Sequence, residues 1–234
     1  MEIAGLRLLV VGATGVIGGA LTALAAERGA RTAVAGRDPA RLAAVAAAVG
    51  AGPGLRFDAY DLDGCAALAS RAAAALGGLD AVVTAFGTVA FGRAEECSDA
   101  VDEHLLTVNA LAPVAVLRGA LAVLPPGGAL AAVTGAVVST PTAGMAGYGA
   151  SKAALAAWLD AVRLEQRRHR ITVLDARLPH LDTGFAGRAV AGQAPRLPAG
   201  ADLPAYLAAL LDGLRTGAAR LEAGAPGGGP LLSR

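Results

Sequence analysis

Short apolar runs alternate along this chain with longer, alanine-rich amphipathic segments. The apolar runs have the length of strands and cover residues 6–11, 31–35, 55–57, 81–85, 129–134, 172–178 and 218–223. The segments between them have helical spacing and cover residues 17–28, 39–49, 65–76, 99–111 continuing as 113–124, 148–168 and 203–214. Strands that alternate with helices form right-handed βαβ units, so this order predicts a parallel sheet covered by helices.

The regular pattern fits one domain over residues 1–223, and a chain that is 55% hydrophobic can fill its core. Residues 179–201 interrupt the pattern, because they are rich in Gly, Pro, Ala and Arg. A loop of that length in a compact domain is usually functional, and we expect residues 184–215 to form a lid. The tail, residues 224–234, contains three consecutive glycines and is predicted to be disordered.

Charge and composition exclude several classes of protein. The formal net charge of +1 argues against a general nucleic-acid or membrane-surface binder. No uninterrupted apolar run reaches about 18 residues, so no membrane span is expected. Cys65 and Cys97 lie far apart, with no metal-binding or redox spacing. We therefore expect reduced thiols, no metal and a cytoplasmic location.

A glycine-rich turn follows the first expected strand. Gly12, Gly15 and Gly18 have the spacing Gly-x-x-Gly-x-x-Gly, and a helix follows at once. In a strand–turn–helix context, such glycines permit a tight turn, a close approach of the backbone to a pyrophosphate and close packing of helix on strand. The alternative is an ordinary β–α loop, but its position at the first crossover favours a dinucleotide site.

The end of the second strand normally selects the ribose of the dinucleotide. An acid there bonds a free 2′-hydroxyl, whereas an arginine accommodates a 2′-phosphate. Here Gly36 is followed by Arg37, which favours NADP(H) over NAD(H). Asp38 is the competing candidate, but its place before Pro39 suits a helix cap better. A solvated surface arginine is the alternative for Arg37.

The chain has one lysine, Lys152, and one asparagine, Asn109, while every other permanently cationic side chain is arginine. Lys152 follows Tyr148 by four residues, which places both side chains on one face of a helix. An ammonium there stabilises a tyrosinate, and the ordinary tyrosine pKa of about 10 is too high for acid–base work near neutrality. A solvated helix face is the alternative for this pair, and a kinking or capping amide is the alternative for Asn109.

The glycine turn, Asn109 and Tyr148-x-x-x-Lys152, in this order and at these separations, resemble the short-chain dehydrogenase/reductase family over roughly residues 6–184. The resemblance implies a Rossmann-type doubly wound sheet of about seven strands. It also implies hydride transfer between a nicotinamide cofactor and a carbonyl or alcohol, with Tyr148 as acid and base. Lys152 would lower the tyrosine pKa and bond the nicotinamide ribose, and Asn109 would hold a water that links Lys152 to solvent.

The resemblance extends to further positions around the cofactor. Asp61 and Leu62 match the pair that holds the adenine, and Pro179 and Thr183 match the segment at the nicotinamide end. The full set of expected cofactor-binding residues is Gly12, Thr14, Gly15, Val16, Ile17, Gly36, Arg37, Asp61, Leu62, Ala85, Phe86, Gly87, Tyr148, Lys152, Pro179, Leu181 and Thr183.

The chain departs from the family at the serine that normally bonds the substrate oxygen, thirteen residues before the tyrosine. That position is Gly135. Thr134 is adjacent but should point to the other face of the strand unless a bulge turns it. Ser139 or Thr142 on the following loop are the other candidates, and a large carbonyl substituent could fill the space instead.

Two smaller departures concern loops. The family's Asn-Asn-Ala-Gly is replaced by residues 84–87, of which only Gly87 matches, and its Pro-Gly is replaced by Pro179 and His180. His180 could line the mouth of the site, although a surface position is favoured.

The leading hypothesis is an NADPH-dependent carbonyl reductase acting on a small molecule, or an alcohol dehydrogenase that runs the same step in reverse. The alternative is an NADP(H)-binding sensor or scaffold that catalyses weakly or not at all, because Gly135 replaces the serine. Phe185, Arg188, Arg196 and Tyr206 would line the lid. The opposite wall would be formed by Phe86, Val89 and Phe91. The long helices are expected to pair into a homodimer or homotetramer.

Overall fold

The computed structural model describes residues 1–52, 54–224 and 228–234. It contains an eight-stranded sheet in the order β3-β2-β1-β4-β5-β6-β7-β8. The strands are β1 Arg7–Val11, β2 Arg31–Gly36, β3 Leu55–Arg56, β4 Ala81–Thr84, β5 Ala129–Val133, β6 Thr172–Ala176, β7 Arg220–Ala223 and β8 Pro230–Ser233. All neighbours are parallel except β7 and β8. The predicted doubly wound α/β fold is confirmed.

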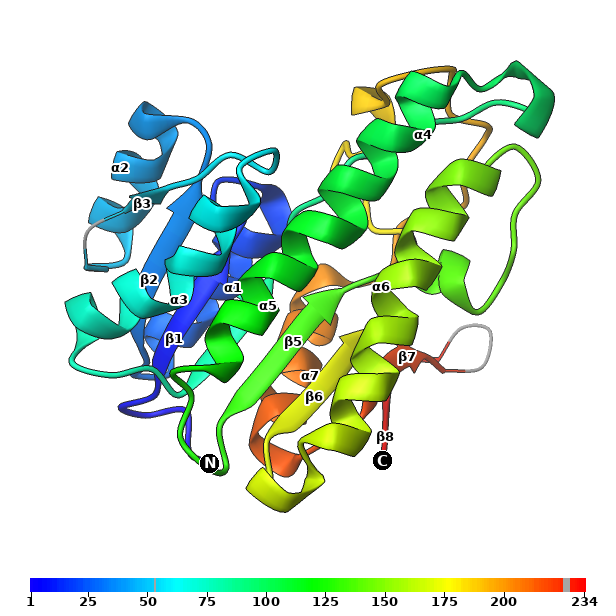
Figure 1. Ribbon diagram of the computed structural model, residues 1–234. Helices are drawn as coiled ribbons and strands as arrows, with labels where there is room; N and C mark the ends of the chain where they lie inside the picture. The colour runs from blue at the N-terminus through cyan, green and yellow to red at the C-terminus, as the bar shows by residue number, and fades with distance from the viewer. Residues whose placement is uncertain (53, 225–227) are drawn as a thin grey trace.

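Helices cover both faces of the sheet (Figure 1). They are α1 Val16–Glu27, α2 Pro39–Ala48, α3 Leu62–Leu76, α4 Asp99–Leu106, α5 Ala112–Leu121, α6 Ala146–Glu165 and α7 Leu203–Thr216. One core cluster joins α3, α5 and α6 to one face, and a second joins α1, α2 and α7 to the other. The short helical turns are η1 Ala94–Glu96, η2 Thr107–Leu111, η3 Ala136–Val138, η4 Arg167–His169 and η5 Ala186–Arg188.

The prediction that the tail is disordered is wrong for its last residues, because they form a strand. Pro230–Ser233 pairs antiparallel with Arg220–Ala223 and forms the edge of the sheet. Leu232 packs against the core cluster that contains α7. This contact with a distant element stabilises a strand that its own short sequence does not predict. Residues 225–227 lie outside the described part of the chain.

The long helical stretch of α4, η2 and α5 passes a length and composition test for a membrane-spanning helix. Within Asp99–Leu121, a window of 18 residues has a mean hydropathy of 1.4, and half of that window is buried inside the protein. Its apolar residues, including Leu105 and Leu117, contribute to the core instead. A core helix explains the composition, and the expectation of no membrane span stays a prediction.

Candidate active site

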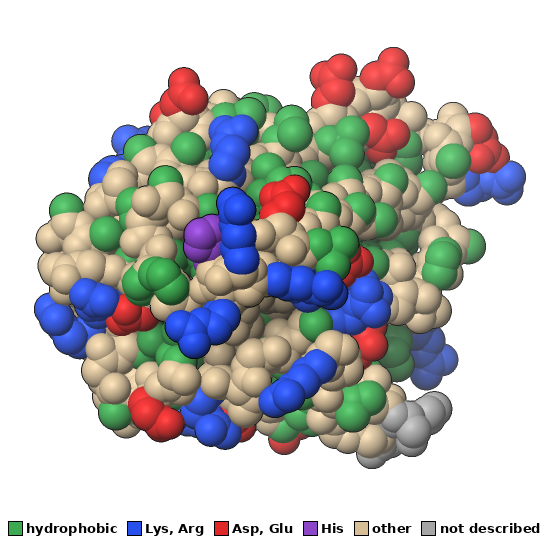
Figure 2. Space-filling model, turned by 60° about the horizontal axis from the view of Figure 1, so that its bottom comes forward, with side chains coloured by type: hydrophobic (Ala, Val, Ile, Leu, Met, Phe, Trp, Pro, Cys, Tyr) green, Lys and Arg blue, Asp and Glu red, His purple; other side chains and the backbone are tan. Residues whose placement is uncertain are grey.

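The predicted site residues gather at one end of the sheet, where the parallel strands finish. The arrowheads of β5 and β6 point to this end in Figure 1, and the loop that follows β6 lies there beside α4. Figure 2 turns the opposite end forward, where arginine side chains stand among acidic and apolar ones. Ligands of open parallel sheets bind at the carboxyl ends of the strands, so this is the end at which a site is expected.

Two glycines at the turn after β1 have no space for a side chain. Gly12 has a φ of +94°, and a Cβ there would lie 2.7 Å from the carbonyl oxygen of Ala85. A Cβ on Gly18 would lie 2.3 Å from the carbonyl oxygen of Gly12. Helix α1 begins after Gly15 with no side-chain cap and no acid in its first turn. Its first N–H groups and positive dipole end therefore suit a phosphate group.

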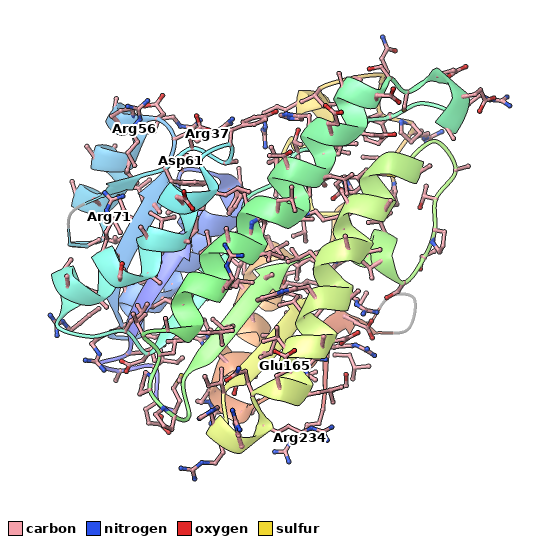
Figure 3. All side chains as sticks on the ribbon, viewed as in Figure 1. Arg37, Arg56, Asp61, Arg71, Glu165 and Arg234 are labelled. Carbon is pink, nitrogen blue, oxygen red and sulfur yellow. The ribbon has the colours of Figure 1, made fainter. Side chains whose placement is uncertain are left out.

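Two arginines flank this turn at the end of β2. Asp38 caps α2 by accepting a hydrogen bond from the N–H of Arg41 at 3.0 Å, as its position before a proline predicts. The Arg41 guanidinium also donates to the carbonyl oxygen of Thr14 at 2.7 Å. Arg37 is exposed at the same end of the molecule (Figure 3). Sequence reasoning missed Arg41, although its place one turn after Arg37 was a signal.

Asp61 and Leu62 begin helix α3. Asp61 accepts a hydrogen bond from the N–H of Gly64 at 2.9 Å and so caps the helix. It lies at the same end of the molecule as Arg37 (Figure 3). The adjacent Tyr60 hydroxyl is 2.6 Å from Nδ1 of His104 on α4, which ties this loop to the helix above the sheet.

Tyr148 and Lys152 lie one turn apart on α6, as predicted. Lys152 is only 4% exposed, and its Nζ donates to the carbonyl oxygen of Val133 at 3.0 Å, at the end of β5. Burial lowers the pKa of Lys152 to about 8, and the negative charge of Asp175 opposes this shift. The alternative of a solvated helix face is therefore wrong for the lysine.

The pKa of Tyr148 differs from the expectation. Burial raises it to about 12, whereas the resemblance implied that Lys152 would lower it. Two observations explain the difference. The ring of Phe185 packs against Tyr148, with the ring centroids 6.4 Å apart, and this contact helps to exclude water from the phenol. Lys152 bonds Val133 rather than the tyrosine.

Asn109 is fully buried and ties three segments together. Its Oδ1 accepts from the N–H of Thr88 at 2.8 Å, and its Nδ2 donates to the carbonyl oxygen of Thr88 at 2.9 Å and to Oγ of Ser151 at 3.0 Å. A Cβ on Gly87 would lie 2.8 Å from Asn109 Oδ1 and 3.1 Å from Lys152 Nζ, so these three residues converge.

The backbone of Asn109 lies in η2, a π-helical turn. Pro113 follows by four residues and has no N–H, so the usual α-helical hydrogen bond to the Asn109 carbonyl cannot form. Such turns inside α-helices are frequent at functional sites. The role of Asn109 at the site stays a prediction, and the π-helical turn is compatible with it.

Gly135 follows β5 and lies beside the tyrosine. Its φ is +110°, and a Cβ there would lie 3.8 Å from the Tyr148 hydroxyl. Thr134 does not replace the missing serine, because its hydroxyl bonds the buried carboxylate of Asp175. The glycine therefore leaves a position close to the phenol without a side-chain donor.

The two loop candidates also bond elsewhere. Ser139 lies within hydrogen-bonding distance of Glu222 and Arg177, at 3.1 and 2.9 Å. Thr142 donates to the carbonyl oxygen of Thr140 at 3.2 Å. Each of these hydroxyls thus has a partner away from the tyrosine.

The loop after β6 closes over this end of the sheet. The N–H of Val190 donates to the carbonyl oxygen of Val89, and the N–H of Phe91 donates to that of Ala191, both at 2.9 Å. Val89 and Phe91 are buried beneath it. At the neck of the loop, Asp182 accepts from the N–H of Gly200 at 3.0 Å.

The start of the loop carries the remaining predicted positions. Leu181 is buried, and its carbonyl oxygen accepts from the N–H of Thr183 at 2.7 Å. Pro179 precedes His180, whose ring pairs with Asp182 at 3.1 Å. Leu181 thus holds this segment against the core cluster that contains α7.

Three expected lining residues lie elsewhere or face outward. Tyr206 is 3% exposed and packs in the core with α7. Phe86 packs edge-on against Phe57, with their ring centroids 5.1 Å apart. Arg188 donates to the carbonyl oxygen of Thr183 at 3.3 Å on the outside of the loop. The sequence alone does not show whether an aromatic side chain on a helix, or one beside a glycine turn, packs in the core or lines the site.

Acidic, histidine and cysteine side chains do not form a metal site in the described part of the chain, where no group of three or more could hold an ion. The expectation of no metal stays a prediction.

Comparison with known proteins identifies a family and a shared fold. Residues 7–194 match the family described as short chain dehydrogenase. No curated protein sequence matches the chain. A dehydrogenase/reductase from Sinorhizobium meliloti is 28% identical, with a TM-score of 0.74 over 79% of this chain and 75% of that one. A double mutant of a Serratia marcescens short-chain dehydrogenase/reductase is 25% identical, with a TM-score of 0.73 over 82% and 80%.

A third structure, a short chain dehydrogenase from Burkholderia cenocepacia in complex with NADP, covers more of the chain. Its TM-score is 0.79 over 92% of both chains, and its sequence identity is 24%.

Proposed function

Because the chain belongs to the short-chain dehydrogenase family of NAD(P)-dependent oxidoreductases, we propose that it reduces a carbonyl compound to an alcohol with NADPH, or catalyses the reverse oxidation. The observation that supports this best is the convergence of Lys152 and Asn109 on Gly87, one helical turn along α6 from Tyr148. Gly87 leaves room between Lys152 Nζ and Asn109 Oδ1, where any larger residue would intrude.

In the proposed reaction, the Tyr148 hydroxyl donates a proton to the carbonyl oxygen, and in reverse it removes the proton of the alcohol. The Lys152 ammonium would stabilise the tyrosinate that remains and would hold the nicotinamide ribose when the cofactor is bound. Pro113 has no N–H to donate to the backbone carbonyl of Asn109. This carbonyl would instead hold a water that connects Lys152 to solvent. NADPH, when bound, supplies the hydride that adds to the carbonyl carbon.

The choice of NADP(H) rests on the end of β2. Arg37 is exposed there, and Arg41 lies beside the glycine turn through its bond to Thr14. Asp38 is engaged in capping α2, which weakens it as a partner for a ribose hydroxyl. The structural relative from Burkholderia cenocepacia has NADP bound.

The proposed substrate is an apolar or mixed carbonyl compound. Phe185 and Gly135 both lie next to Tyr148, and neither offers a hydrogen bond from its side chain. The substrate oxygen would then depend on Tyr148, while its bulk occupies the space that a serine takes in the family.

A second candidate function is an NADP(H)-binding sensor or scaffold. Gly135 and the high pKa of Tyr148 favour it, because both weaken proton transfer at this site. The buried Lys152 argues against it, since burying an ammonium is costly and a pure binding protein gains nothing from it.

NADPH consumption against a panel of ketones, aldehydes and quinones tests the proposal, with Tyr148→Phe as the decisive variant. Tyr206→Phe is the matched control, because it removes a buried hydroxyl from the core at α7. Turnover that is lost in the first variant and kept in the second supports the reductase. Binding of NADPH with no tyrosine-dependent turnover would favour the sensor.

We also propose that the chain forms a homodimer or homotetramer through its long helices. Leu106 and Leu111 are 41% and 51% exposed on the stretch from α4 to α5, where a second copy could cover them. The cytoplasmic location and the absence of nucleic-acid and membrane partners stay predictions.

A further inference from the structure

A fully buried carboxylate, Asp175, lies in the middle of the sheet on β6. Its side chain is 0% exposed. One oxygen accepts a hydrogen bond from Thr134 at the end of β5, and the other pairs with Nε of Arg177 at 2.7 Å. Arg177 is 12% exposed and extends to Glu222 on β7 at 3.3 Å. The reaction proposed above uses none of these groups.

Asp175 lies on the face of the sheet that α6 covers. Side chains alternate along a strand, so Asp175 shares a face with Val173, which packs in the core cluster that contains α6. Thr134 shares that face with Ala132, which belongs to the same cluster. The residue before Thr134 supplies the carbonyl oxygen that binds Nζ of Lys152. The carboxylate and the buried ammonium therefore lie beneath the same helix, one on β6 and the other at the end of β5.

Stability alone does not explain a buried ion pair here. Taking two charges out of water costs several kcal/mol per ion, and apolar replacements of similar volume are often neutral or stabilising. On this face the carboxylate is flanked by its partners Thr134 and Arg177, and beyond them lie the apolar residues Val173 and Ala132. The buried carboxylate of Asp175 therefore needs an explanation other than its contribution to packing.

The charged and titratable groups around Lys152 can be grouped by element. They are Tyr148 on α6, Asp102 of α4 against Gly147, Asp175 and Arg177 on β6, and Glu222 on β7. Asn109 and Gly87 contribute no charge. Burial lowers the pKa of Lys152, and among these groups Asp175 is the one that raises it.

We propose that Asp175 is a positioning residue that acts through Lys152: its buried carboxylate, oriented by Thr134 and Arg177, keeps the lysine in the ammonium form at neutral pH. The inference rests on the proposed function, since the ammonium matters because it stabilises the tyrosinate of Tyr148. It also predicts how Lys152 ionises, and that ionisation can be measured without any substrate.

Lys152 is the only lysine in the chain, so protein labelled with 13C at the lysine ε carbon gives one resonance to follow against pH. In Asp175→Asn the pKa of Lys152 should fall by about one pH unit or more, because a nearby opposite charge is removed. Asp160→Asn is the matched control. It removes a carboxylate from the same helix, where Asp160 pairs with Arg163 and Arg220, away from Lys152.

An unchanged pKa of Lys152 in Asp175→Asn, or an equal fall in Asp160→Asn, overturns the inference. Asp175→Ser removes the same charge and carries the same expectation if the Asn variant does not fold. Turnover is measured separately. If the wild type shows no turnover that depends on Tyr148, the proposed function is refuted. The role of Asp175 is decided by the titration of Lys152 alone.

Discussion

The ring of Phe185, in the loop after β6, lies 6.4 Å from the ring of Tyr148 on α6 and is tilted by 51° to it. This contact places an apolar side chain from the loop after β6 on the residue that carries the proposed chemistry. It links the position of that loop to the ionisation of the phenol, because burial raises the pKa of Tyr148 to about 12.

Truncating Phe185 should therefore bring the tyrosine pKa down. In Phe185→Ala, water reaches the phenol, and we expect the pKa of Tyr148 to move from about 12 towards the ordinary value of about 10. Tyrosinate absorbance against pH measures this, with the same titration in a Tyr148→Phe background subtracting Tyr60 and Tyr206. An unaltered titration would show that other neighbours keep the phenol dry.

Gly135 should tolerate a side chain poorly, whatever its chemistry. At a φ of +110°, both Gly135→Ser and Gly135→Ala are expected to lower the free energy of unfolding by about 1–3 kcal/mol. The pair isolates the hydroxyl, since both variants carry the same Cβ 3.8 Å from the Tyr148 hydroxyl. We expect kcat/KM to be about tenfold or more higher for the serine than for the alanine variant. Equal values for the two would mean that an added hydroxyl does not reach the substrate oxygen.

The order of strands and helices followed from local sequence because each element carries its own periodicity. The expected bounds, such as 172–178 for the strand that spans Thr172–Ala176, run on into the loops at the carboxyl ends. Asp38 and Pro39 predicted the start of α2 through capping chemistry that needs no distant contact. The positions of Tyr148 and Lys152 followed from helical spacing in the same way.

What the sequence did not reveal depends on contacts between distant segments. The strand Pro230–Ser233 exists through its pairing with β7, and its three preceding glycines suggested disorder. Phe185 reaches Tyr148 through the loop after β6, whose course no local pattern specifies. Thr134 and Asp175 meet across two strands, so the charge beneath Lys152 could not be predicted from either segment alone.

Arg37 should discriminate between the two nicotinamide cofactors. Loss of a hydrogen bond to a charged group costs about 1.5–3 kcal/mol, so Arg37→Ala should raise the KM for NADPH by roughly 10- to 100-fold. The KM for NADH should change little, because NADH has no 2′-phosphate. Arg56→Ala is the control, as Arg56 lies at the same end of the molecule (Figure 3). Equal effects on both cofactors would assign Arg37 a structural role instead.

Burial of Lys152 should leave a signature in the pH dependence of stability. Its pKa is about 8 in the folded protein and about 10.5 in the unfolded chain, so between these values the unfolded state binds more protons. The contribution of this group to stability therefore rises with pH from 8 to 10.5, and below pH 8 the buried charge costs the fold roughly 3 kcal/mol.

Replacing the lysine by an apolar residue of similar length removes that dependence. Lys152→Met should be more stable than the wild type at pH 7, and the difference should shrink as the pH approaches 10.5. Urea unfolding of both proteins at a series of pH values between 7 and 10 measures it. The comparison stops at pH 10 because Tyr148 has a raised pKa in the folded protein. Above pH 10 the folded state keeps the tyrosine proton that the unfolded chain loses, so stability falls as the pH rises further. A difference between the two proteins that is constant with pH would mean that Lys152 titrates normally in the fold.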